Sequence, residues 1–199
     1  CASLLEEVST ALQTGEVPDT STAVQHKALL ALVSLQAREL KKAYDLVVSL
    51  IKDLDKCEPT TFFTSTAYLG AVEVLVKLLH LGKDDEDEVA KFAKRQSLVN
   101  DLGSALSTLY EFDQLFAISQ PRSLLWKGVH FALRGKDAKA DAKFAEAREL
   151  ALSLGMDFDA AVARFYQGRY SRNTLESGNF TKDAFHEFQQ LGVAFNGQL

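Results

Sequence analysis

The sequence predicts an all-α fold, built of antiparallel helical hairpins that stack on one another. Apolar residues recur at spacings of three and four along almost the whole chain, which is the period of an amphipathic helix. Single glycines and prolines interrupt these patterns where helices would end. No segment alternates strictly between apolar and polar residues, as a half-buried strand would. We therefore expect one helical-repeat domain that covers residues 1–199.

Helix ends are predicted from the glycines, the prolines and the residues that can cap a helix. Gly82 is expected to end a strongly apolar helix, Gly135 to lie in a hairpin turn and Gly192 to end the last helix. Thr181 is expected to cap the start of that last helix. The predicted helices run over residues 2–14, 22–36, 39–57, 62–81, 86–118, 121–134, 137–154, 158–177 and 182–191.

Residues 22–57 contain neither glycine nor proline, so the sequence allows one long helix or two. A single helix here would exceed the usual length in globular proteins, and no coiled-coil heptad supports it. We therefore expect a turn near residues 36–39. The first helix would bury Ala28, Leu29, Leu32 and Leu35, and the second Leu40, Ala43, Tyr44, Val47, Leu50 and Leu54. The helix over 62–81 is apolar around most of its circumference, so it should be buried on more than one side.

The composition is that of an ordinary soluble protein. Hydrophobic residues make up 47% and charged residues 25%, and the formal net charge is −5. The acidic balance and the lack of a basic stripe argue against nucleic acid as a partner. No uninterrupted run of 18 apolar residues occurs, so we expect no membrane span. Cys1 and Cys57 are too few for a disulfide framework, which favours a reducing, cytoplasmic location.

Small residues recur where the two helices of a hairpin would touch. Within residues 121–156, small and aromatic residues are interleaved: Gly128, Phe131, Ala140, Phe144 and Ala147. A small residue at a helix crossing lets two backbones approach, and the aromatic rings fill the space beside it. A degenerate second copy is expected downstream, with its small and aromatic positions at Gly168, Ala184 and Phe188. Units of this kind cannot bury their apolar faces alone, so they stack.

This spacing resembles the tetratricopeptide repeat, in which G-x2-Y on the first helix precedes A-x3-F on the second. Gly128-x2-Phe131 and Ala140-x3-Phe144 match that pattern. Leu124 stands where the repeat has Trp, and no closing proline follows. The resemblance implies a tetratricopeptide-like α-solenoid.

Residues 121–128, 145–156 and 159–169 resemble more closely the tetratricopeptide-like C-terminal region of large signalling ATPases. These include the soluble adenylate cyclase type, and bacterial relatives that join a cyclase or kinase domain to an AAA-type ATPase. The resemblance covers residues 62–192 and is best over 121–170. It implies that any catalytic domain would lie upstream, in a longer parent chain; Cys1, already inside a helical pattern, agrees with that expectation.

The sequence contains no recognisable pattern of catalytic or ligand-binding residues. It has no G-x-x-x-x-G-K-[ST] phosphate loop and no G-x-S-x-G nucleophile motif. Its four histidines, at positions 26, 80, 130 and 186, are far apart and form no zinc-binding motif. The acidic run over residues 84–88 suits the first turn of a helix, where the helix dipole favours negative charge. We therefore expect no catalytic residue, no cofactor and no metal in this chain.

Basic residues on the helices that would line a concave repeat surface form a candidate partner groove. They are Lys127, Arg134, Arg164, Arg169 and Arg172, with Trp126 as an aromatic anchor. Such a groove would receive an acidic or extended peptide. The other interpretation is that the basic residues are simply solvated and that Trp126 belongs to the core.

The function favoured by the sequence is that of a non-catalytic helical-repeat module for protein–protein interaction or regulation within a larger signalling protein. Its partner would be a protein, a peptide or another domain of the parent chain, with no membrane and no nucleic acid involved. The alternative is a structural spacer or assembly subunit that packs on neighbouring repeats.

Overall fold

The computed structural model describes residues 20–59, 61–84, 86–171 and 174–195, and every regular element in these residues is a helix. The all-α class is therefore confirmed, while the helix predicted over residues 2–14 lies outside the described residues. The α-helices are α2 (Thr20–Gln36), α3 (Leu40–Leu54), α4 (Ser65–Asp84), α5 (Glu86–Ala90), α6 (Arg95–Leu115), α7 (Gln120–Leu133), α8 (Asp137–Ser153), α9 (Asp157–Tyr170) and α10 (Thr174–Gln190). Two short 3-10 helices, η1 (Phe62–Thr64) and η2 (Ala117–Ser119), precede α4 and α7.

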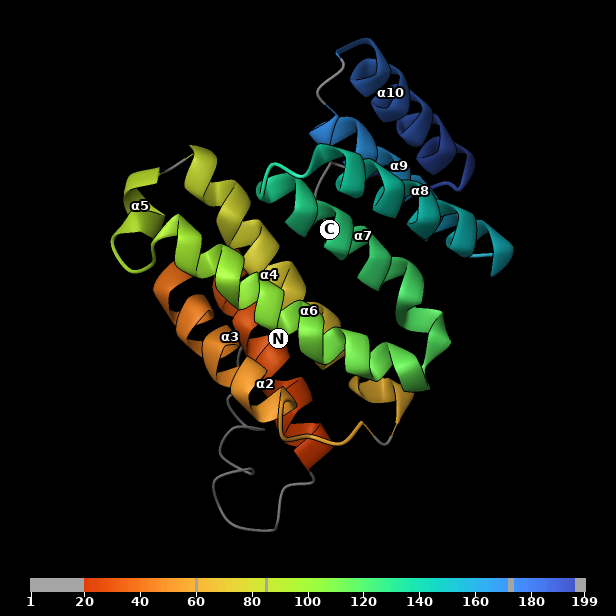
Figure 1. The fold of residues 1–199 in the computed structure, drawn as a ribbon. Coiled ribbons are helices and arrows are strands. Elements are labelled where there is room, and N and C mark those ends of the chain that lie inside the picture. Colours follow the sequence, from red (N-terminus) through yellow and green to blue (C-terminus); the bar gives the residue numbers. More distant parts are fainter. Residues whose placement is uncertain (1–19, 60, 85, 172–173, 196–199) are drawn as a thin grey trace. The chain divides into compact units, whose positions relative to one another are not determined.

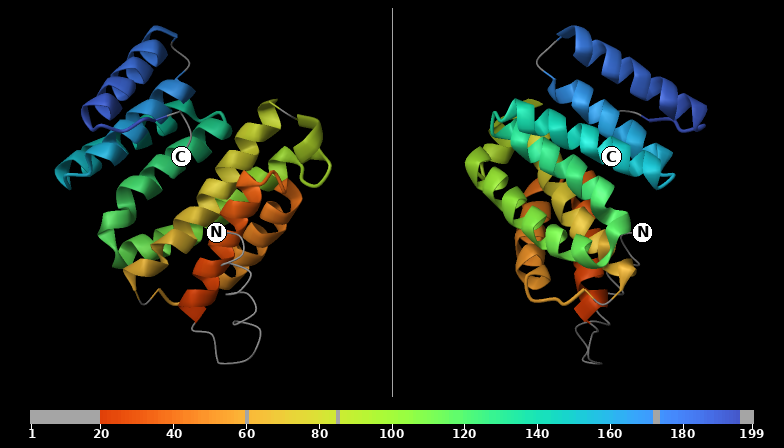
Figure 2. Two further views of the ribbon diagram at one scale, coloured as in Figure 1. Left: turned by 180° about the vertical axis from the view of Figure 1, so that it is seen from behind. Right: turned by 45° about the vertical axis from the view of Figure 1, so that its right-hand side comes forward.

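The helices cluster into two compact units, Cys1–Leu115 and Phe116–Leu199. The first contains α2 to α6 with η1, and the second contains η2 with α7 to α10. Figures 1 and 2 colour the first unit from red to green and the second from green to blue.

Helix α4 is the centre of the first unit, where it packs against α2, α3, α5 and α6. Its buried residues point in several directions around the helix: Ala67, Tyr68, Ala71, Val72, Val74, Leu75, Val76, Leu78 and Leu79. Each fully buried leucine or valine contributes about 1.5–3 kcal/mol of hydrophobic stabilisation. The expectation that this helix is buried on more than one side is confirmed. By length and apolar composition alone Phe62–Leu81 could also cross a membrane, but 67% of that stretch is buried, as in a core helix.

The predicted turn in residues 22–57 is present, because α2 ends at Gln36 and α3 begins at Leu40. The backbone N–H of Glu39 donates to the Ser34 carbonyl at 2.9 Å, and that of Arg38 donates to the Leu35 carbonyl at 3.1 Å. These two bonds are those of a Schellman motif, which places one residue in the left-handed conformation. Arg38 is that residue, with φ of 62°.

Most of the predicted core positions of α2 and α3 are buried, with Leu29 as an exception. Leu29 is 41% exposed, so its assignment to the core was wrong. Beside the predicted Ala28 and Leu35, helix α2 also buries Val24 and Ala31, and its alanines let α2 lie close to its neighbours. Because leucine is more apolar than alanine, the sequence pattern selected Leu29 and missed Ala31.

Two predicted helix boundaries in the first unit were wrong. Helix α4 runs through Gly82 to Asp84, since a single glycine costs only about 1 kcal/mol in a helix. The helix predicted over 86–118 is interrupted between Ala90 and Arg95. The interruption lets Val89 and Ala93 be buried and brings the ring of Phe92 to 5.7 Å from that of Tyr44. Tertiary burial here overrides a continuous helical pattern.

The second unit consists of helices that follow one another in space in chain order. Helix α7 packs against α8, α8 against α9 and α9 against α10, and α7 also contacts α9 (Figure 1). Helix α9 begins and ends 37 residues after α7, at residues 157 and 170 against 120 and 133. Helix α10 likewise begins and ends 37 residues after α8, at residues 174 and 190 against 137 and 153. The two hairpins therefore have the same element lengths and the same spacing.

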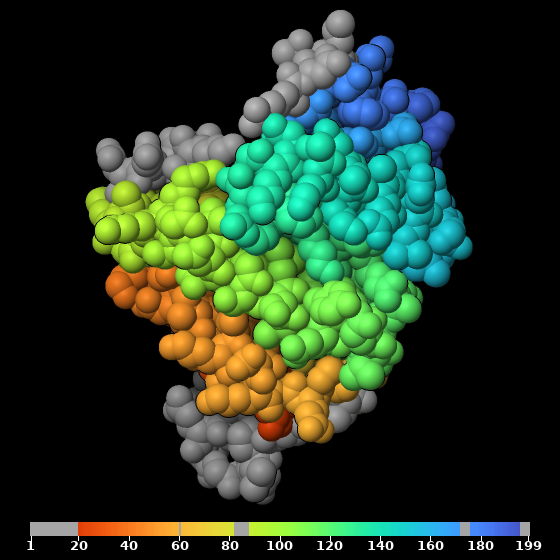
Figure 3. Space-filling model, in the orientation of Figure 1, coloured from red at the N-terminus to blue at the C-terminus, as the bar shows by residue number. Residues whose placement is uncertain are grey.

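Helix α8 lies at the surface of the second unit, as the space-filling view shows (cyan in Figure 3). Only one stripe of it is buried: Ala140, Phe144, Ala147 and Ala151. Helix α10 buries Ala184 and Phe188, which lie 37 residues after Ala147 and Ala151. Glycines end both helices in the same way, with φ of 69° at Gly155 and at Gly192. The predicted stop at Gly192 is therefore present.

The predicted break between the last two helices was wrong. It was expected between residues 177 and 182, but α9 ends at Tyr170 and α10 already begins at Thr174. Thr181 lies inside α10 and caps nothing: its hydroxyl donates to the Ser177 carbonyl one turn earlier, at 2.9 Å. The 37-residue shift also corrects the predicted alignment, because it matches Gly168 with Phe131 rather than with Gly128. The helix predicted over 158–177 was expected to end just before Gly178, yet Gly178 is an exposed residue within α10.

Both hairpins nevertheless have a glycine where their helices come closest. A Cβ atom on Gly128 would lie 2.6 Å from the Phe144 ring. A Cβ atom on Gly168 would lie 2.5 Å from Thr181 Oγ1 and 2.9 Å from the Thr181 backbone nitrogen. At Gly168 the obstacle is partly backbone, which cannot rotate away. The carbonyl of Gly168 also accepts a hydrogen bond from Ser177 Oγ at 2.8 Å.

We predict that Gly168→Ala destabilises the chain by about 1–3 kcal/mol, because the added methyl group forces α9 and α10 apart. Gly178→Ala is the matched control, since a Cβ there meets nothing within 4 Å. It should stabilise the chain by about 0.5–1 kcal/mol through helix propensity alone. Urea denaturation followed by circular dichroism measures both changes. Equal effects of the two alanines would contradict the close packing at Gly168.

Candidate binding surfaces

The structure does not place Trp126 where an anchor for a partner would have to be. Trp126 is 1% exposed, and its ring meets the ring of Tyr166 edge to face at a centroid distance of 5.3 Å. It therefore joins α7 to α9 inside the second unit, and its assignment to an open groove is corrected. The signal was present in the sequence, because a large aromatic residue on an apolar helix face is most often core.

The basic residues of the predicted groove lie in different surroundings. Arg164 is held toward α10, where its guanidinium lies 3.0 Å from Glu187 and 3.3 Å from Asp183. Lys127 is half-buried on α7. Arg134 and Arg169 are exposed near the C-terminal ends of α7 and α9, where cations complement the helix dipole. Arg172 lies outside the described residues.

An ion-pair network links three helices of the second unit. Glu187 on α10 accepts from Arg148 on α8 at 3.1 Å and from Arg164 on α9 at 3.0 Å. The Arg148 and Glu187 side chains are each 26% exposed, so solvent screens this pair only partly. Arg148 Nε is buried and has no hydrogen-bond partner. The bond from Nη2 to Glu187 must therefore offset most of the free-energy cost of burying this guanidinium. Sequence reasoning missed this network because its members are 23 to 39 residues apart.

A second ion pair joins the first turns of α7 and α9. Arg122 Nε donates to Asp159 Oδ1, and the two side chains are only 18% and 15% exposed. The Arg122 guanidinium also lies 5.7 Å from the centre of the Phe158 ring, a cation–π distance. Arg122 and Asp159 are themselves 37 residues apart, so the same position in consecutive hairpins carries opposite charges. This arrangement fixes how one hairpin lies on the next.

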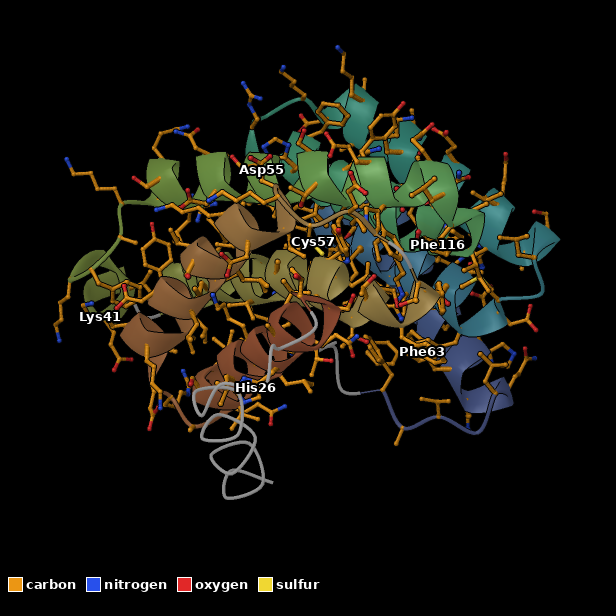
Figure 4. All side chains as sticks on the ribbon, turned by 90° about the horizontal axis from the view of Figure 1, so that it is seen from below. His26, Lys41, Asp55, Cys57, Phe63 and Phe116 are labelled. Atoms are coloured by element: carbon orange, nitrogen blue, oxygen red, sulfur yellow. The ribbon has the colours of Figure 1, made fainter. Side chains whose placement is uncertain are left out.

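The first unit contains an open groove of about 1190 Å³ beside the first turns of α3. Figure 4 labels Lys41 at this end of α3, with Asp55 and Cys57 at the other end. The groove is lined by Arg38, Glu39, Leu40, Lys41, Lys42, Asp45, Leu46, Ser49, Glu88, Lys91 and Phe92. The lining thus combines leucine and phenylalanine side chains with side chains of both charges. None of these residues was selected from the sequence as part of a site.

Most charges along this groove are paired with each other. Lys41 lies 2.5 Å from Asp45, and Lys42 lies 2.8 Å from Glu39. Both pairs are exposed, so each contributes well under 1 kcal/mol. Arg38 is exposed and forms no ion pair with any residue that the structure describes. The groove can therefore offer a partner two exposed cations, Arg38 and Lys91, that form no ion pair with any residue that the structure describes.

The half-buried Tyr44 on α3 contacts Phe92, which lines the groove. Tyr44 donates to Asp101 Oδ2 at 2.9 Å and so connects α3 to α6. Burial, and next the hydrogen bond to Asp101 and its charge, raise the pKa of Tyr44 to about 12. Burial also raises the pKa of Tyr68 to about 12, with smaller contributions from the charges of Cys57 and Glu111. Both hydroxyls are thus structural donors that stay protonated in the fold.

Within residues 20–59, 61–84, 86–171 and 174–195, no three His, Cys, Asp or Glu side chains come together in a way that could hold a metal ion. A small cavity of about 100 Å³ lies between Leu79, Val89 and Leu98, in the segment between α5 and α6. Arg95 spans this point, donating from Nη1 to the Leu79 carbonyl at 3.3 Å. The groove beside α3 is much larger than this cavity and is open to solvent.

We predict that Tyr44 and Tyr68 ionise late in an alkaline titration followed by tyrosinate absorbance. Because their folded-state pKa values are raised from about 10, the stability that they contribute is fully present below pH 10 and is lost as the pH rises toward 12. Tyr44→Phe and Tyr68→Phe should each remove one late-ionising group from the curve. Ionisation of every tyrosine near pH 10 in a chain still folded by circular dichroism would contradict the burial of these two hydroxyls.

We also predict that Glu187→Gln destabilises the chain by about 1–2 kcal/mol, since it leaves the partly buried Arg148 and Arg164 without their shared carboxylate. Glu146→Gln is the matched control, because Glu146 only pairs with Lys143 on the exposed face of α8. That change should cost less than about 0.5 kcal/mol. Chemical denaturation of both variants separates the outcomes, and a cost at Glu187 no larger than at Glu146 would show that the network is not stabilising.

No family model, curated protein or solved structure matches this chain. Any function must therefore be inferred from the geometry of its own residues.

Proposed function

We propose that this chain is a non-catalytic helical-repeat module that binds a protein or peptide partner. The observation that carries the proposal is the second unit, in which two hairpins of equal element lengths follow each other with a shift of 37 residues. Contacts of α7 with α8, α8 with α9 and α7 with α9 are the nearest-neighbour contacts that a tetratricopeptide-like solenoid would have. Such scaffolds present extended surfaces for recognition, and their helices serve to position those surfaces.

The groove beside α3 is the surface that we assign to the partner. A broad, open groove suits a segment of another protein better than a small molecule, which is usually enclosed on most sides. Apolar side chains such as Leu46 and Phe92 offer contact area, and the surrounding charges offer orientation, as the core and rim of protein interfaces do. The unpaired Arg38 favours a partner that brings a carboxylate.

The backbone at Arg38 supports this assignment. A non-glycine residue in the left-handed conformation costs about 1–2 kcal/mol, and the Schellman turn would be satisfied at lower cost by glycine. Strain of this kind is found disproportionately at functional sites. The arginine side chain that replaces the favoured glycine is exposed and lines the groove.

Arg38→Gly separates folding from binding, because it relieves the backbone while removing the guanidinium. We predict a gain in stability of about 1 kcal/mol, reduced by the greater freedom of glycine in the unfolded chain, together with a loss of partner binding. Lys52→Ala is the control, since Lys52 is an exposed cation near the other end of α3 and does not line the groove. Partners captured by the unmodified chain would be identified, purified and titrated calorimetrically against all three proteins.

Two results would count against the proposal. One is the capture of no partner whose purified form binds the unmodified chain. The other is equal affinity of a purified partner for the unmodified chain and for Arg38→Gly. That result would show that the partner does not bind through Arg38 in the groove beside α3. Thermal melts of the variants show whether a loss of affinity reflects unfolding.

We further propose that the module belongs to a larger cytoplasmic signalling protein that carries a cyclase, kinase or ATPase domain. The support is the resemblance of residues 121–128, 145–156 and 159–169 to the repeat region of such proteins. The sequence that flanks this chain in its genome tests the idea. A phosphate-loop ATPase or cyclase domain upstream is the expected finding, and its absence would remove the signalling assignment while leaving the repeat module.

A further inference from the structure

Helix α2 has an accessible side that carries no charged residue. Positions 22, 25, 29, 32, 33 and 36 follow one another at helical spacing, so they share one side of α2. Leu29 is the most exposed apolar residue among them, at 41%. We call this surface the α2 face, and its residues, all partly or well exposed, are Thr22, Gln25, Leu29, Leu32, Val33 and Gln36.

The α2 face differs from the solvent side of an ordinary surface helix. The one charged residue in α2 is Lys27, which pairs with Asp53 on α3 and donates to Ser49 Oγ at 3.1 Å. Helix α8, by contrast, has charged side chains spread along its exposed side: Lys139, Asp141, Glu146 and Glu149. A helix that is uncharged and apolar around its circumference is normally covered by other elements. The α2 face therefore has the composition of a buried contact.

We propose that residues 2–14 of this chain fold back on the α2 face as an amphipathic helix. This segment precedes Thr20, the first residue that the structure describes. Its apolar residues recur at spacings of three and four, whereas its two acidic residues, at positions 6 and 7, fall outside that stripe. The stripe consists of Leu4, Leu5, Val8 and Leu12. An uncharged stripe thus meets an uncharged face, and the carboxylates remain in water.

The connection between this segment and α2 has the length of a hairpin turn. Residues 15–19 separate the two, and antiparallel helices are joined by about two to five residues. Gly15 and Pro18 lie within this connection, and both residue types mark turns. Leu5 and Leu29 are equally far from it, nine residues from residue 14 and from Thr20. Consecutive helices also pack on each other elsewhere, as α2 does on α3 and α7 on α8.

A tethered segment has an advantage over a separate molecule for this face. A short connection gives the segment an effective concentration of about a millimolar, which a second copy or another protein would have to exceed. The contact also gives Leu29 the burial that its place in the helical pattern predicts. It uses none of the residues that line the groove beside α3, so it can fail without affecting the binding proposed there.

Cross-linking in the full chain tests the proposal. In a background with Cys1→Ser and Cys57→Ser, the pair Leu5→Cys and Leu29→Cys should react with a short bismaleimide to give a link within one chain. Glu7→Cys with Leu29→Cys is the matched control, because it has the same tether. It should cross-link about tenfold more slowly, since a docked helix turns residue 7 away from α2. Equal rates for the two pairs, or links only between chains, overturn the proposal.

Thermal melts of the full chain provide a second measurement that needs no reagent. Leu29→Gln should lower the melting temperature by about 2–4 °C, because it weakens the contact with Leu5. In a chain that already carries Leu5→Asp and Val8→Asp, the same change should have no effect, since the segment is then undocked. Leu152→Gln is the matched control, because Leu152 is 44% exposed on α8, and it should change neither chain. An equal effect of Leu29→Gln in both backgrounds also overturns the proposal.

Discussion

Helices α8 and α10 of the second unit each bury a stripe of alanine and phenylalanine residues, and that stripe can be buried only by a neighbouring helix in chain order. Helix α8 illustrates the constraint, because Ala140, Phe144, Ala147 and Ala151 are its fully buried positions and most of its remaining surface faces solvent. Such a helix cannot be stable alone, since its own propensity is too weak without tertiary packing. The order of the chain therefore dictates the order of packing. The whole unit depends on these pairwise contacts being close.

Close contact is achieved differently in the two hairpins. In the first, Gly128 leaves space for the ring of Phe144, whereas in the second Gly168 leaves space for the backbone and hydroxyl of Thr181. Aligned by the 37-residue shift, Gly168 matches Phe131, one turn away from the position of Gly128. The fold thus requires a small residue at the crossing but does not fix its position along the helix. An alignment that pairs Gly168 with Gly128 therefore shifts α9 by three residues relative to α7.

Features that follow from local chemistry could be predicted from the sequence. The turn between α2 and α3 was expected from helix length alone, and the stop at Gly192 from glycine's tolerance of positive φ. The breaks at residues 91–94 and 171–173 could not be found in this way. No glycine or proline marks either of them, and at the first the gain comes from burying Val89 and Ala93. The helix end predicted next to Gly178 is absent, because an exposed position in a helix tolerates an isolated glycine.

The candidate site was less accessible to sequence reasoning than the fold. A count of arginines and lysines identifies basic residues but not their partners, and the pairs Arg122–Asp159 and Arg148–Glu187 span 37 and 39 residues. Only the packing of α9 and α10 on the earlier helices brings those partners together.

The same pairing determines which surfaces remain available for recognition. Because Arg122, Arg148 and Arg164 neutralise carboxylates inside the second unit, they cannot also attract an acidic partner to it. Arg38 keeps its charge available to a partner, and a costly backbone conformation holds it at the groove beside α3. On α10 of the second unit, the exposed Phe185 lies among polar and charged side chains such as Lys182 and Asp183. The groove beside α3 therefore has the chemistry that suits a carboxylate-bearing segment, because its exposed guanidinium is not neutralised within the fold.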